Sequence, residues 1–340
     1  MKKTTYSIAL TILILLTSVG FVSANETQSI KTAPTIAILD TAIQSSHPMF
    51  NGRIVFEACV TQWSSCPNGM REMEGTNSAL VPTNFISRNG FDHGTQMASL
   101  AIATNPNVQI VFVRIIGMNS QGFRQASGET TVNQALDWVL RNKERLNIQA
   151  VSLSQSHHNL GPVGTDYCPK TPITEKKIQD LATLGVPVFV SAGNGRDYLR
   201  IDWPACIPAA IAMGATMPTK SIAIYSNHDE KLTDFFALGT TRAFNTEGRL
   251  VNVAGTSAST VIGATQWVMV KAAKPDLTYS EIYDLLAKTA TPTWNSKIKS
   301  GRLLNIDAAL AELQATFKDS LSNGLMNSTV SKKTLEKIGA

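Results

Sequence analysis

The sequence lacks the features that mark nucleic-acid-binding, repeat and disordered proteins. Only 16% of its 340 residues are charged, 7% are aromatic, and the formal net charge is +5. No cluster of lysine and arginine is present, with or without interleaved aromatic residues, so we expect no nucleic-acid partner. No internal repeat, Pro-rich linker or low-complexity block divides the chain. An apolar content of 43% is enough to bury a sizeable core, in one large domain or two.

Long apolar runs are absent except for one at the N-terminus, around Ile8 to Val22. It follows Met1-Lys2-Lys3 and ends at Val22-Ser23-Ala24, the pattern of a secretory signal peptide with a small-residue cleavage site. We expect residues 1–24 to be removed by cleavage after Ala24, with an uncleaved membrane anchor as the alternative. Because no later stretch can span a bilayer, we expect a secreted or periplasmic protein with no stable membrane association.

Cysteine is also scarce, at four residues. None ends the apolar N-terminal run, which argues against a lipoprotein, and no C-x-x-C pair or common zinc spacing is present. In an oxidising compartment an even number of cysteines favours disulfides, and four cysteines allow three pairings. We favour Cys59–Cys66, which would close a short loop, together with Cys168–Cys206.

Metal-binding patterns are missing as well. No compact Asp-rich loop offers enough oxygen ligands for a recognisable calcium site. Asp197, Asp202 and Asp234 qualify by charge alone and are interpreted as surface carboxylates. His157-His158 and His228 lack a carboxylate–histidine spacing for zinc and are interpreted as solvated loop histidines. We expect no cofactor and no metal, with calcium binding left open.

From residue 35 onward, short apolar runs alternate with segments of helical character. Continuous apolar runs predict buried strands at 35–39, 108–116, 148–153, 186–190 and 209–215. Apolar spacing and capping signals predict helices at 131–143, 175–184, 261–273, 278–289 and 307–317. Residues 51–90 are rich in Gly, Pro, Asn and Ser and are interpreted as an irregular surface excursion. The alternation predicts an α/β fold with a doubly wound, mostly parallel sheet and helices on both faces.

Four polar residues stand where such a fold gathers its functional groups. Asp40 and Asn194 each follow an apolar strand, while His93 and Ser257 each stand at the start of a helix. In a parallel sheet the carboxyl ends of the strands lie beside the N-termini of the following helices, where ligands bind. We therefore expect all four at one edge of the sheet. Taken singly, each has an ordinary structural explanation, such as a helix N-cap for Ser257.

Together the four residue types make a working set for nucleophilic catalysis. A serine hydroxyl needs a base at neutral pH, and histidine can take its proton and return it to a leaving group. A buried carboxylate fixes the histidine tautomer, and an asparagine amide with the serine N–H can bind an oxyanion. Lipase or esterase chemistry is disfavoured, because Ser259 stands where a Gly-x-Ser-x-Gly elbow needs its last glycine.

These segments resemble the subtilisin-like serine proteases, the subtilases. They follow the chain order aspartate, histidine, asparagine, serine, and the resemblance spans roughly residues 33–312. It rests on four segments: Ala37-Ile38-Leu39-Asp40-Thr41, His93-Gly94-Thr95, Ser191-Ala192-Gly193-Asn194 and Gly255-Thr256-Ser257.

The resemblance implies a three-layer α/β/α catalytic domain over residues 35–312, followed by a helix end and polar tail at 313–340. It implies an exported endopeptidase that forms an acyl-enzyme on Ser257, with His93 as general base and acid. Asp40 would orient the histidine, and Asn194 would donate its side-chain amide to the oxyanion. The alternative is a catalytically impaired subtilisin-like fold that serves as a protein-binding module.

The same resemblance assigns the substrate contacts. Protein or peptide substrates are expected to lie against Ser154, Gln155, Ser156 and Gly193, and we expect a monomer. The family usually has glycine where this chain has Ser156, so we expect a narrower pocket that is less suited to a large aromatic side chain. Gln155 adds polarity to the same strand.

Two further departures concern the backbone and the N-terminus. The family usually has Asp-Thr-Gly, whereas this chain has Asp40-Thr41-Ala42, and we expect Ala42 to adopt a negative φ. Only residues 25–34 separate the predicted signal peptide from the first strand. We therefore expect a mature enzyme that begins near Asn25 without a large propeptide, with the disulfides restricting the unfolded chain instead.

Overall fold

A ten-stranded sheet forms the centre of the computed structural model, which describes residues 33–87, 90–125, 127–158, 160–163 and 166–316. The strand order is β13-β14-β10-β9-β8-β7-β1-β4-β2-β3. The predicted signal peptide and most of the predicted tail lie outside the described residues. The strands are β1 (Thr35–Asp40), β2 (Ile54–Val60), β3 (Glu72–Glu74), β4 (Gln109–Arg114), β7 (Ala150–Leu153), β8 (Val188–Ser191), β9 (Ile211–Thr216), β10 (Phe235–Leu238), β13 (Thr291–Thr293) and β14 (Gly301–Leu303).

The sheet is mostly parallel, which confirms the predicted fold class. Every neighbouring pair is parallel except β2–β3 and β13–β14 at the two ends. Two small antiparallel pairs lie outside it: β5 (Gly117–Met118) with β6 (Arg124–Gln125), and β11 (Thr240–Phe244) with β12 (Leu250–Ala254).

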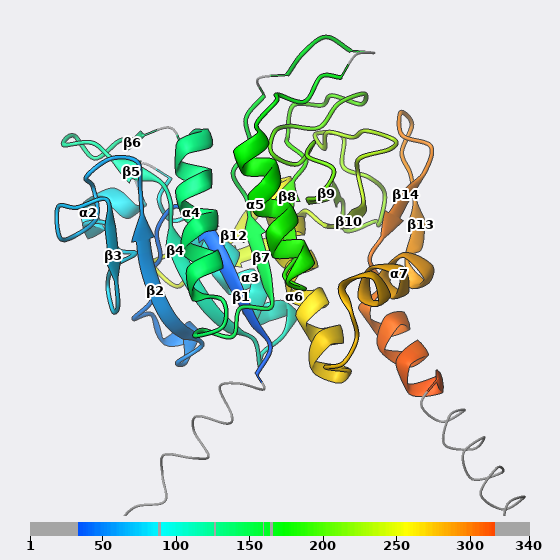
Figure 1. Cartoon of the computed structure of the whole chain (residues 1–340), viewed down its shortest axis with the longest axis horizontal. Helices are drawn as coiled ribbons and strands as arrows, with labels where there is room; N and C mark the ends of the chain where they lie inside the picture. Colours follow the sequence, from blue (N-terminus) through cyan, green and yellow to red (C-terminus); the bar gives the residue numbers. More distant parts are fainter. Residues whose placement is uncertain (1–32, 88–89, 126, 159, 164–165, 317–340) are drawn as a thin grey trace, which may run out of the picture. The chain divides into compact units, whose positions relative to one another are not determined.

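Helices cover both faces of the sheet. Figure 1 shows α4 (Glu129–Asn142) and α5 (Pro172–Thr183) in front of it, with α3 (His93–Thr104) and α6 (Thr256–Ala273) behind. The helix α7 (Tyr279–Thr289) packs against α6, and residues 306–316 form a last helix. Short helical turns at η1 (Pro48–Phe50) and α2 (Thr83–Ile86) complete the elements. None of the described helices combines the length and apolarity that crossing a bilayer requires.

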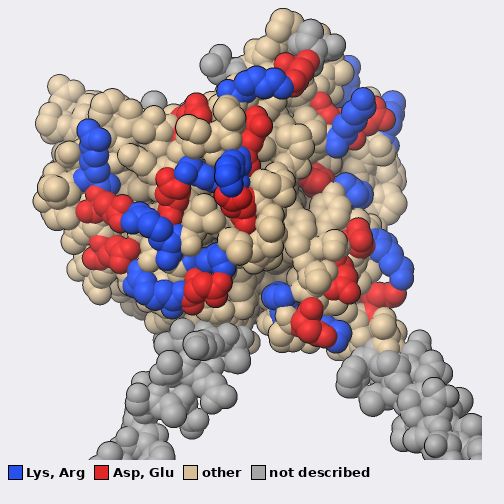
Figure 2. All heavy atoms as spheres, in the orientation of Figure 1, with Lys and Arg blue, Asp and Glu red and all other residues tan. Residues whose placement is uncertain are grey.

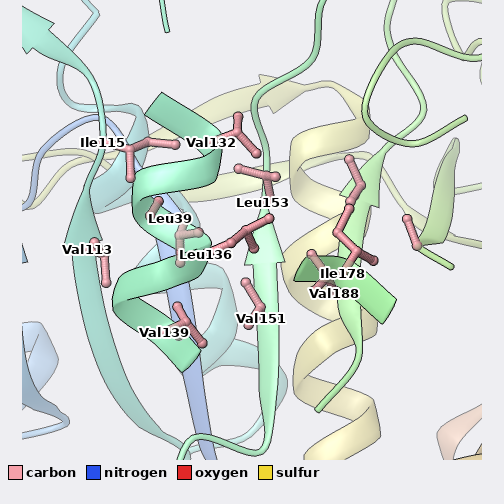
Figure 3. Close-up of a cluster of buried hydrophobic side chains, with 14 of the residues drawn as sticks. Leu39, Val113, Ile115, Val132, Leu136, Val139, Val151, Leu153, Ile178 and Val188 are labelled. Atoms are coloured by element: carbon pink, nitrogen blue, oxygen red, sulfur yellow. The ribbon is translucent and has the colours of Figure 1, made fainter. Parts of the chain in front are cut away.

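The continuous apolar run of β1 follows from burial on both sides. Ile36 and Ile38 belong to the core under α3 and α6, whereas Ala37 and Leu39 belong to the core under α4 and α5. All four are fully buried. Figure 3 shows Leu39 facing the apolar side of α4, which contributes Val132, Leu136 and Val139. Successive strand residues point to opposite faces, so a strand covered on both sides needs no polar alternation.

The interpretation of residues 51–90 as an irregular excursion was wrong. They include β2, which pairs with β4 inside the main sheet, and β3, which pairs with β2. Glu57 interrupts the apolar run of β2 but is itself buried, where its carboxylate accepts the N–H of Ala79 at 3.4 Å. A charged residue in a buried strand removes the local signal that identified the other strands.

The structure contains both favoured disulfides. Cys59–Cys66 joins the end of β2 to the loop before β3, over a sequence separation of 7. Cys168–Cys206 joins the segment before α5 to the segment before β9, over a separation of 38. No free cysteine occurs among the described residues.

Charged side chains of both signs mix on the face that carries α4 and α5 (Figure 2). Several of them form ion pairs, including Arg141 with Glu72 at 3.1 Å and Arg145 with Glu74 at 3.0 Å. These pairs are solvent-exposed, so each contributes at most about 1 kcal/mol to stability.

Candidate active site

The predicted site residues come from the carboxyl edge of the sheet, on both sides of β1. This central strand lies between β4 and β7, so the chain winds outward in opposite directions from it, as at the ligand-binding switch point of open α/β sheets. Asp40 ends β1, and Asn194 follows β8 by three residues. The helices α3 and α6, which begin with His93 and Thr256, pack against each other across the same face.

Asp40 and His93 are in direct contact. His93 Nδ1 lies 2.7 Å from Asp40 Oδ1, and the backbone N–H of Thr41 donates to the same oxygen at 2.6 Å. Asp40 is completely buried, whereas the side chain of His93 is 29% exposed. A carboxylate accepts hydrogen bonds only, so Nδ1 carries the proton and Nε2 is left as the basic nitrogen.

The same pair sets the basicity of the imidazole. Burial of the ring acts to lower the pKa of His93, but the charge of Asp40 and its hydrogen bond together outweigh burial and raise the pKa above 6.5. A raised pKa makes Nε2 a stronger proton acceptor once it is deprotonated. This is the behaviour required of a general base that works close to neutral pH.

Thr41 holds the start of α3 in place. Its hydroxyl donates to the carbonyl of Phe91 at 2.8 Å and accepts the N–H of Gly94 at 2.9 Å. A side chain at position 94 would begin 2.5 Å from the carbonyl of Ala42, so glycine permits this close approach. Ala42 is not among the residues with positive φ, which confirms the expected conformation.

Ser257 is the second residue of α6 and not its N-cap, so the ordinary structural explanation weighed for it does not apply. The N-cap is Gly255, with φ 164° and ψ 159°, and no side chain caps the helix. The first backbone N–H groups of a helix have no acceptor within the helix and form the positive end of its dipole. The N–H of Ser257 is therefore a candidate donor to the oxyanion that would form when the Ser257 oxygen attacks a carbonyl carbon.

Asn194 is held in one orientation by Thr256. Its Oδ1 accepts the backbone N–H of Thr256 at 2.9 Å and the Thr256 hydroxyl at 3.1 Å. No described residue forms a hydrogen bond with its amide Nδ2, which can therefore donate to a substrate. The position that a Cβ atom would occupy on Gly255 lies 3.4 Å from Asn194 Nδ2 and 3.8 Å from the backbone nitrogen of Ser257. The two predicted oxyanion donors thus lie on the same side of Gly255, within 4 Å of one point.

One contact expected from the sequence is not formed. Within the described part of the chain, no hydrogen bond joins the Ser257 hydroxyl to His93. The two residues belong to packed helices, but the structure leaves their side chains short of hydrogen-bonding geometry. Such bonds in enzymes without substrate are often long and tighten only when substrate binds.

The predicted substrate segments border the same place. Ser154 donates its hydroxyl to the carbonyl of Ser257 at 3.4 Å, and Gly193 donates its N–H to the Thr256 hydroxyl at 3.2 Å. Gln155 is half-buried between its neighbours. Ser156 turns elsewhere, to the carboxylate of Asp202 at 3.0 Å.

Sequence reasoning missed three residues of the site. Thr41 and Thr256 are adjacent to Asp40 and Ser257, so their place in the motifs was visible but their hydrogen bonds were not. Asp202 was interpreted as a surface carboxylate, but only 6% of its surface is exposed.

The other predicted surface groups also have protein partners. Asp197 pairs with Arg200 at 2.8 Å, and Asp234 accepts the Tyr283 hydroxyl at 2.6 Å. Burial raises the pKa of Asp234 despite that bond. His228 is buried against Phe236 rather than solvated.

No group of three or more His, Cys, Asp or Glu side chains in the described residues is placed to hold a metal ion. A surface cavity of about 610 Å³ lies away from this site, and its lining includes Tyr167, His228 and Lys297. It contains none of the four predicted catalytic residues.

An α/β sheet with a buried Asp–His pair, a serine at a helix start and a free amide donor defines a class of nucleophilic hydrolases. Comparison with known proteins identifies the family. The model of the Subtilase family matches residues 31–323, and the chain belongs to that family.

Individual relatives are distant. The chain is 26% identical over 290 residues to subtilisin E of Bacillus subtilis (strain 168), covering 81% of this chain and 65% of that protein. It is 28% identical over 268 residues to an extracellular serine proteinase of Thermus sp. (strain Rt41A), covering 75% and 54%. The chain thus spans less than two thirds of the length of these relatives. A subtilisin of Bacillus pumilus is 25% identical over 288 residues, covering 81% of this chain and 90% of that protein.

Solved structures show the same fold. The protease domain of PatA, in a mutant form, superposes with a TM-score of 0.64 at 18% identity, covering 83% of this chain and 95% of that one. A cold-adapted subtilisin-like serine proteinase superposes with a TM-score of 0.58 at 20% identity, covering 79% and 87%.

Proposed function

We propose that the protein is a serine endopeptidase that cleaves peptide bonds through an acyl-enzyme on Ser257. The observation that carries this proposal is the paired geometry at the carboxyl edge. His93 is bound by buried Asp40 at 2.7 Å, and Asn194 is held by Thr256, with its amide nitrogen and the Ser257 nitrogen both within 4 Å of the point where a side chain on Gly255 would begin. Membership of the Subtilase family supports the same activity.

In the first half-reaction the Ser257 oxygen attacks the substrate carbonyl carbon while His93 Nε2 accepts the hydroxyl proton. The carbonyl oxygen becomes an oxyanion, which Asn194 Nδ2 and the Ser257 N–H stabilise. His93 then returns the proton to the amine, which leaves as the carbon–nitrogen bond breaks. The product is an ester between the acyl half of the substrate and Ser257.

In the second half-reaction a water molecule attacks that ester. His93 Nε2 takes the proton of the water, the same two donors hold the new oxyanion, and the proton passes to the Ser257 oxygen as it leaves. Asp40 stays ionised throughout and stabilises the imidazolium that forms twice per turnover.

We also propose that the enzyme is exported and acts as a monomer on protein or peptide substrates, with residues 35–312 as its catalytic domain. Two disulfides fit an oxidising compartment, and the N-terminal pattern fits a signal peptide ending at Ala24. Sequencing the N-terminus of the mature protein tests the cleavage site, with Asn25 expected as the first residue.

Peptide hydrolysis tests the activity. Purified protein should convert an internally quenched peptide into two fragments whose masses locate the cleaved bond, and Ser257→Ala should abolish this. The Ser259→Ala variant is the matched control, because that hydroxyl bonds the carbonyl of Thr256 at 2.8 Å inside α6. A folded wild-type protein that binds peptides without cleaving them would support the binding-module alternative instead.

A further inference from the structure

A buried carboxylate closes the space between the two segments expected to hold substrate. Asp202 Oδ2 accepts the hydroxyl of Ser156 at 3.0 Å, and it lies 2.3 Å from the point where a side chain on Gly193 would begin. The backbone N–H of Asp202 bonds the carbonyl of Ala192 at 2.8 Å. The carboxylate therefore touches both predicted walls, residues 154–156 and residues 192–194.

Residues 154–156 connect the neighbourhood of Ser257 with the carboxylate of Asp202. Ser154 contacts the carbonyl of Ser257, and Ser156 contacts Asp202. Both contacts come from the segment that directly follows β7, which therefore borders the nucleophile at one end and Asp202 at the other. A substrate side chain that runs from the scissile carbonyl along this segment would end at Asp202.

Asp202 is anchored as an acceptor by two donors on its other oxygen. Asn227 Nδ2 donates to Oδ1 at 3.0 Å, and His158 Nδ1 approaches the same atom at 2.8 Å. Asn227 cannot turn its amide, because its own oxygen accepts the N–H groups of Gly195 and Asp197 at 2.8 and 3.0 Å. An ionised carboxylate offers about four acceptor positions. Three are filled by described residues, which leaves one on Oδ2 beside Gly193.

No lysine or arginine of the described residues neutralises Asp202. Its one ion-pair partner is His158, whose side chain is 53% exposed and carries charge only when protonated. The nearby Arg200 is committed to Asp197 at 2.8 Å and to the carbonyl of Gly161 at 2.6 Å. A buried carboxylate without a fixed cation favours a ligand that brings one.

We propose that Asp202 selects substrates with lysine or arginine immediately before the cleaved bond. This inference rests on the proposed peptidase function and names its substrate class. The long stem of either side chain would lie between residues 154–156 and 192–194, and its cationic end would fill the open acceptor position on Oδ2. The proposal also gives a reason for Ser156, whose hydroxyl orients the carboxylate, and for Gly193, because a side chain there would begin only 2.3 Å from Oδ2 and collide with it.

Two measurements test this selectivity, the first of them catalytic. At about pH 8, where an ordinary histidine is neutral, peptides that differ only in the residue before the cleaved bond are compared as lysine, arginine, leucine and phenylalanine. The wild type should show kcat/KM for the two cationic peptides about 10- to 100-fold above the apolar ones, as a charge-assisted hydrogen bond allows. Asp202→Asn should remove most of that preference, by lowering kcat/KM for the two cationic peptides at least tenfold more than for the apolar ones.

Asp202→Asn is suited to this test because it keeps the local hydrogen bonds. The new carbonyl oxygen still accepts from Asn227 and His158, and the new amide donates to Ser156. An unchanged thermal unfolding midpoint checks the fold. Glu230→Gln is the matched charge control, since Glu230 is exposed and makes no contact with the substrate segments.

The second measurement does not depend on catalysis. Fluorescence titration with p-aminobenzamidine, a cationic amidine, is performed on Ser257→Ala and on Ser257→Ala combined with Asp202→Asn. At least tenfold weaker binding to the double variant is expected. Equal binding to the two variants, or a wild-type preference for leucine or phenylalanine that Asp202→Asn does not alter, overturns the proposal. Asp202-dependent amidine binding without any peptide hydrolysis would support the cation site and contradict the peptidase function.

Discussion

Two hydrogen-bonded pairs, Asp40–His93 and Thr256–Asn194, determine what single residues can do in this protein. Three of these four residues, Asp40, His93 and Asn194, were identified from sequence, because each follows an apolar strand or begins a helix. The Thr256–Asn194 contact joins positions 62 residues apart, so no local pattern could reveal it. The same holds for Asp202, because sequence gives its charge but not the buried donors that surround it.

Replacing Asn194 by alanine removes one oxyanion donor and leaves the nucleophile and base in place. Loss of such a donor lowers kcat by about 100- to 1,000-fold, and KM should change little because the donor acts mainly in the transition state. Steady-state kinetics on a peptide substrate measures both. Thr256→Ser, which keeps the hydroxyl that orients Asn194, should stay close to wild type, and an unchanged kcat in Asn194→Ala would place the oxyanion elsewhere.

The rise of kcat/KM with pH on the acid side of its profile, the acid limb, reports the pKa of His93 in its pair with Asp40. The base must be neutral to act, so kcat/KM should rise through an apparent pKa above 6.5. Asp40→Asn removes the charge that raises this pKa, so the limb should move to lower pH while the rate falls by about 10⁴-fold. A wild-type limb at or below 6.5 would contradict the assigned coupling.

The same shift has a consequence for stability. The interaction with Asp40 favours protonated His93 in the folded protein. Its contribution to the free energy of unfolding is therefore complete at a pH below 6.5, the pKa of His93 in the unfolded chain. That contribution is lost as pH rises through the raised folded value.

At the scale of helices and strands, most elements with a clear apolar period were predicted, but the short buried strand β10 was missed. The strands β1, β4, β7, β8 and β9 and the helices α4 to α7 overlap their predicted ranges, because burial on two faces or one helical stripe leaves a clear apolar period. The hairpin β11–β12 is exposed or half-buried except at Ala243 and was missed. It matters for function, since β12 ends two residues before Thr256 begins α6.

The Gly94→Ala variant tests how closely the start of α3 must approach the sheet. A methyl group there would begin 2.5 Å from both the Ala42 carbonyl and the Phe112 ring, so Gly94→Ala should force the helix start outward. Overpacking of this kind costs about 1–3 kcal/mol of unfolding free energy, and displacement of His93 should lower kcat as well.

Urea unfolding and peptide kinetics measure the two effects of Gly94→Ala. Gly128→Ala serves as the control, because a methyl group at that helix N-cap meets nothing within 4 Å. Equal stability of the two variants would show that α3 can shift without cost.

At the scale of the whole molecule, the site exists only when the sheet is complete from β1 to β9. Asp40 ends β1, His93 begins the helix that leads to β4 on one side, and Asn194 follows β8 on the other, so the four residues meet only when these strands pair through β1. The alternation of strands and helices predicted this gathering at one edge. The exact distances, including the missing hydrogen bond between Ser257 and His93, follow from packing that the sequence pattern does not encode.

The two disulfides should stabilise the folded molecule unequally. In the loop-closure model, the 38-residue separation of Cys168–Cys206 is worth about 4 kcal/mol and the 7-residue separation of Cys59–Cys66 about 2 kcal/mol. Urea unfolding of the two double Cys→Ser variants compares them. A larger loss on removing Cys59–Cys66 would contradict the entropic explanation.

The most direct test of the central claim is labelling of the folded protein with a fluorophosphonate probe. Such a probe modifies a serine only when a base and oxyanion donors activate it. We predict one modified residue, Ser257, by mass spectrometry of the digested protein, with labelling lost in Ser257→Ala and strongly slowed in His93→Ala. A folded wild-type protein that stays unlabelled, or is labelled at another serine, would contradict the account.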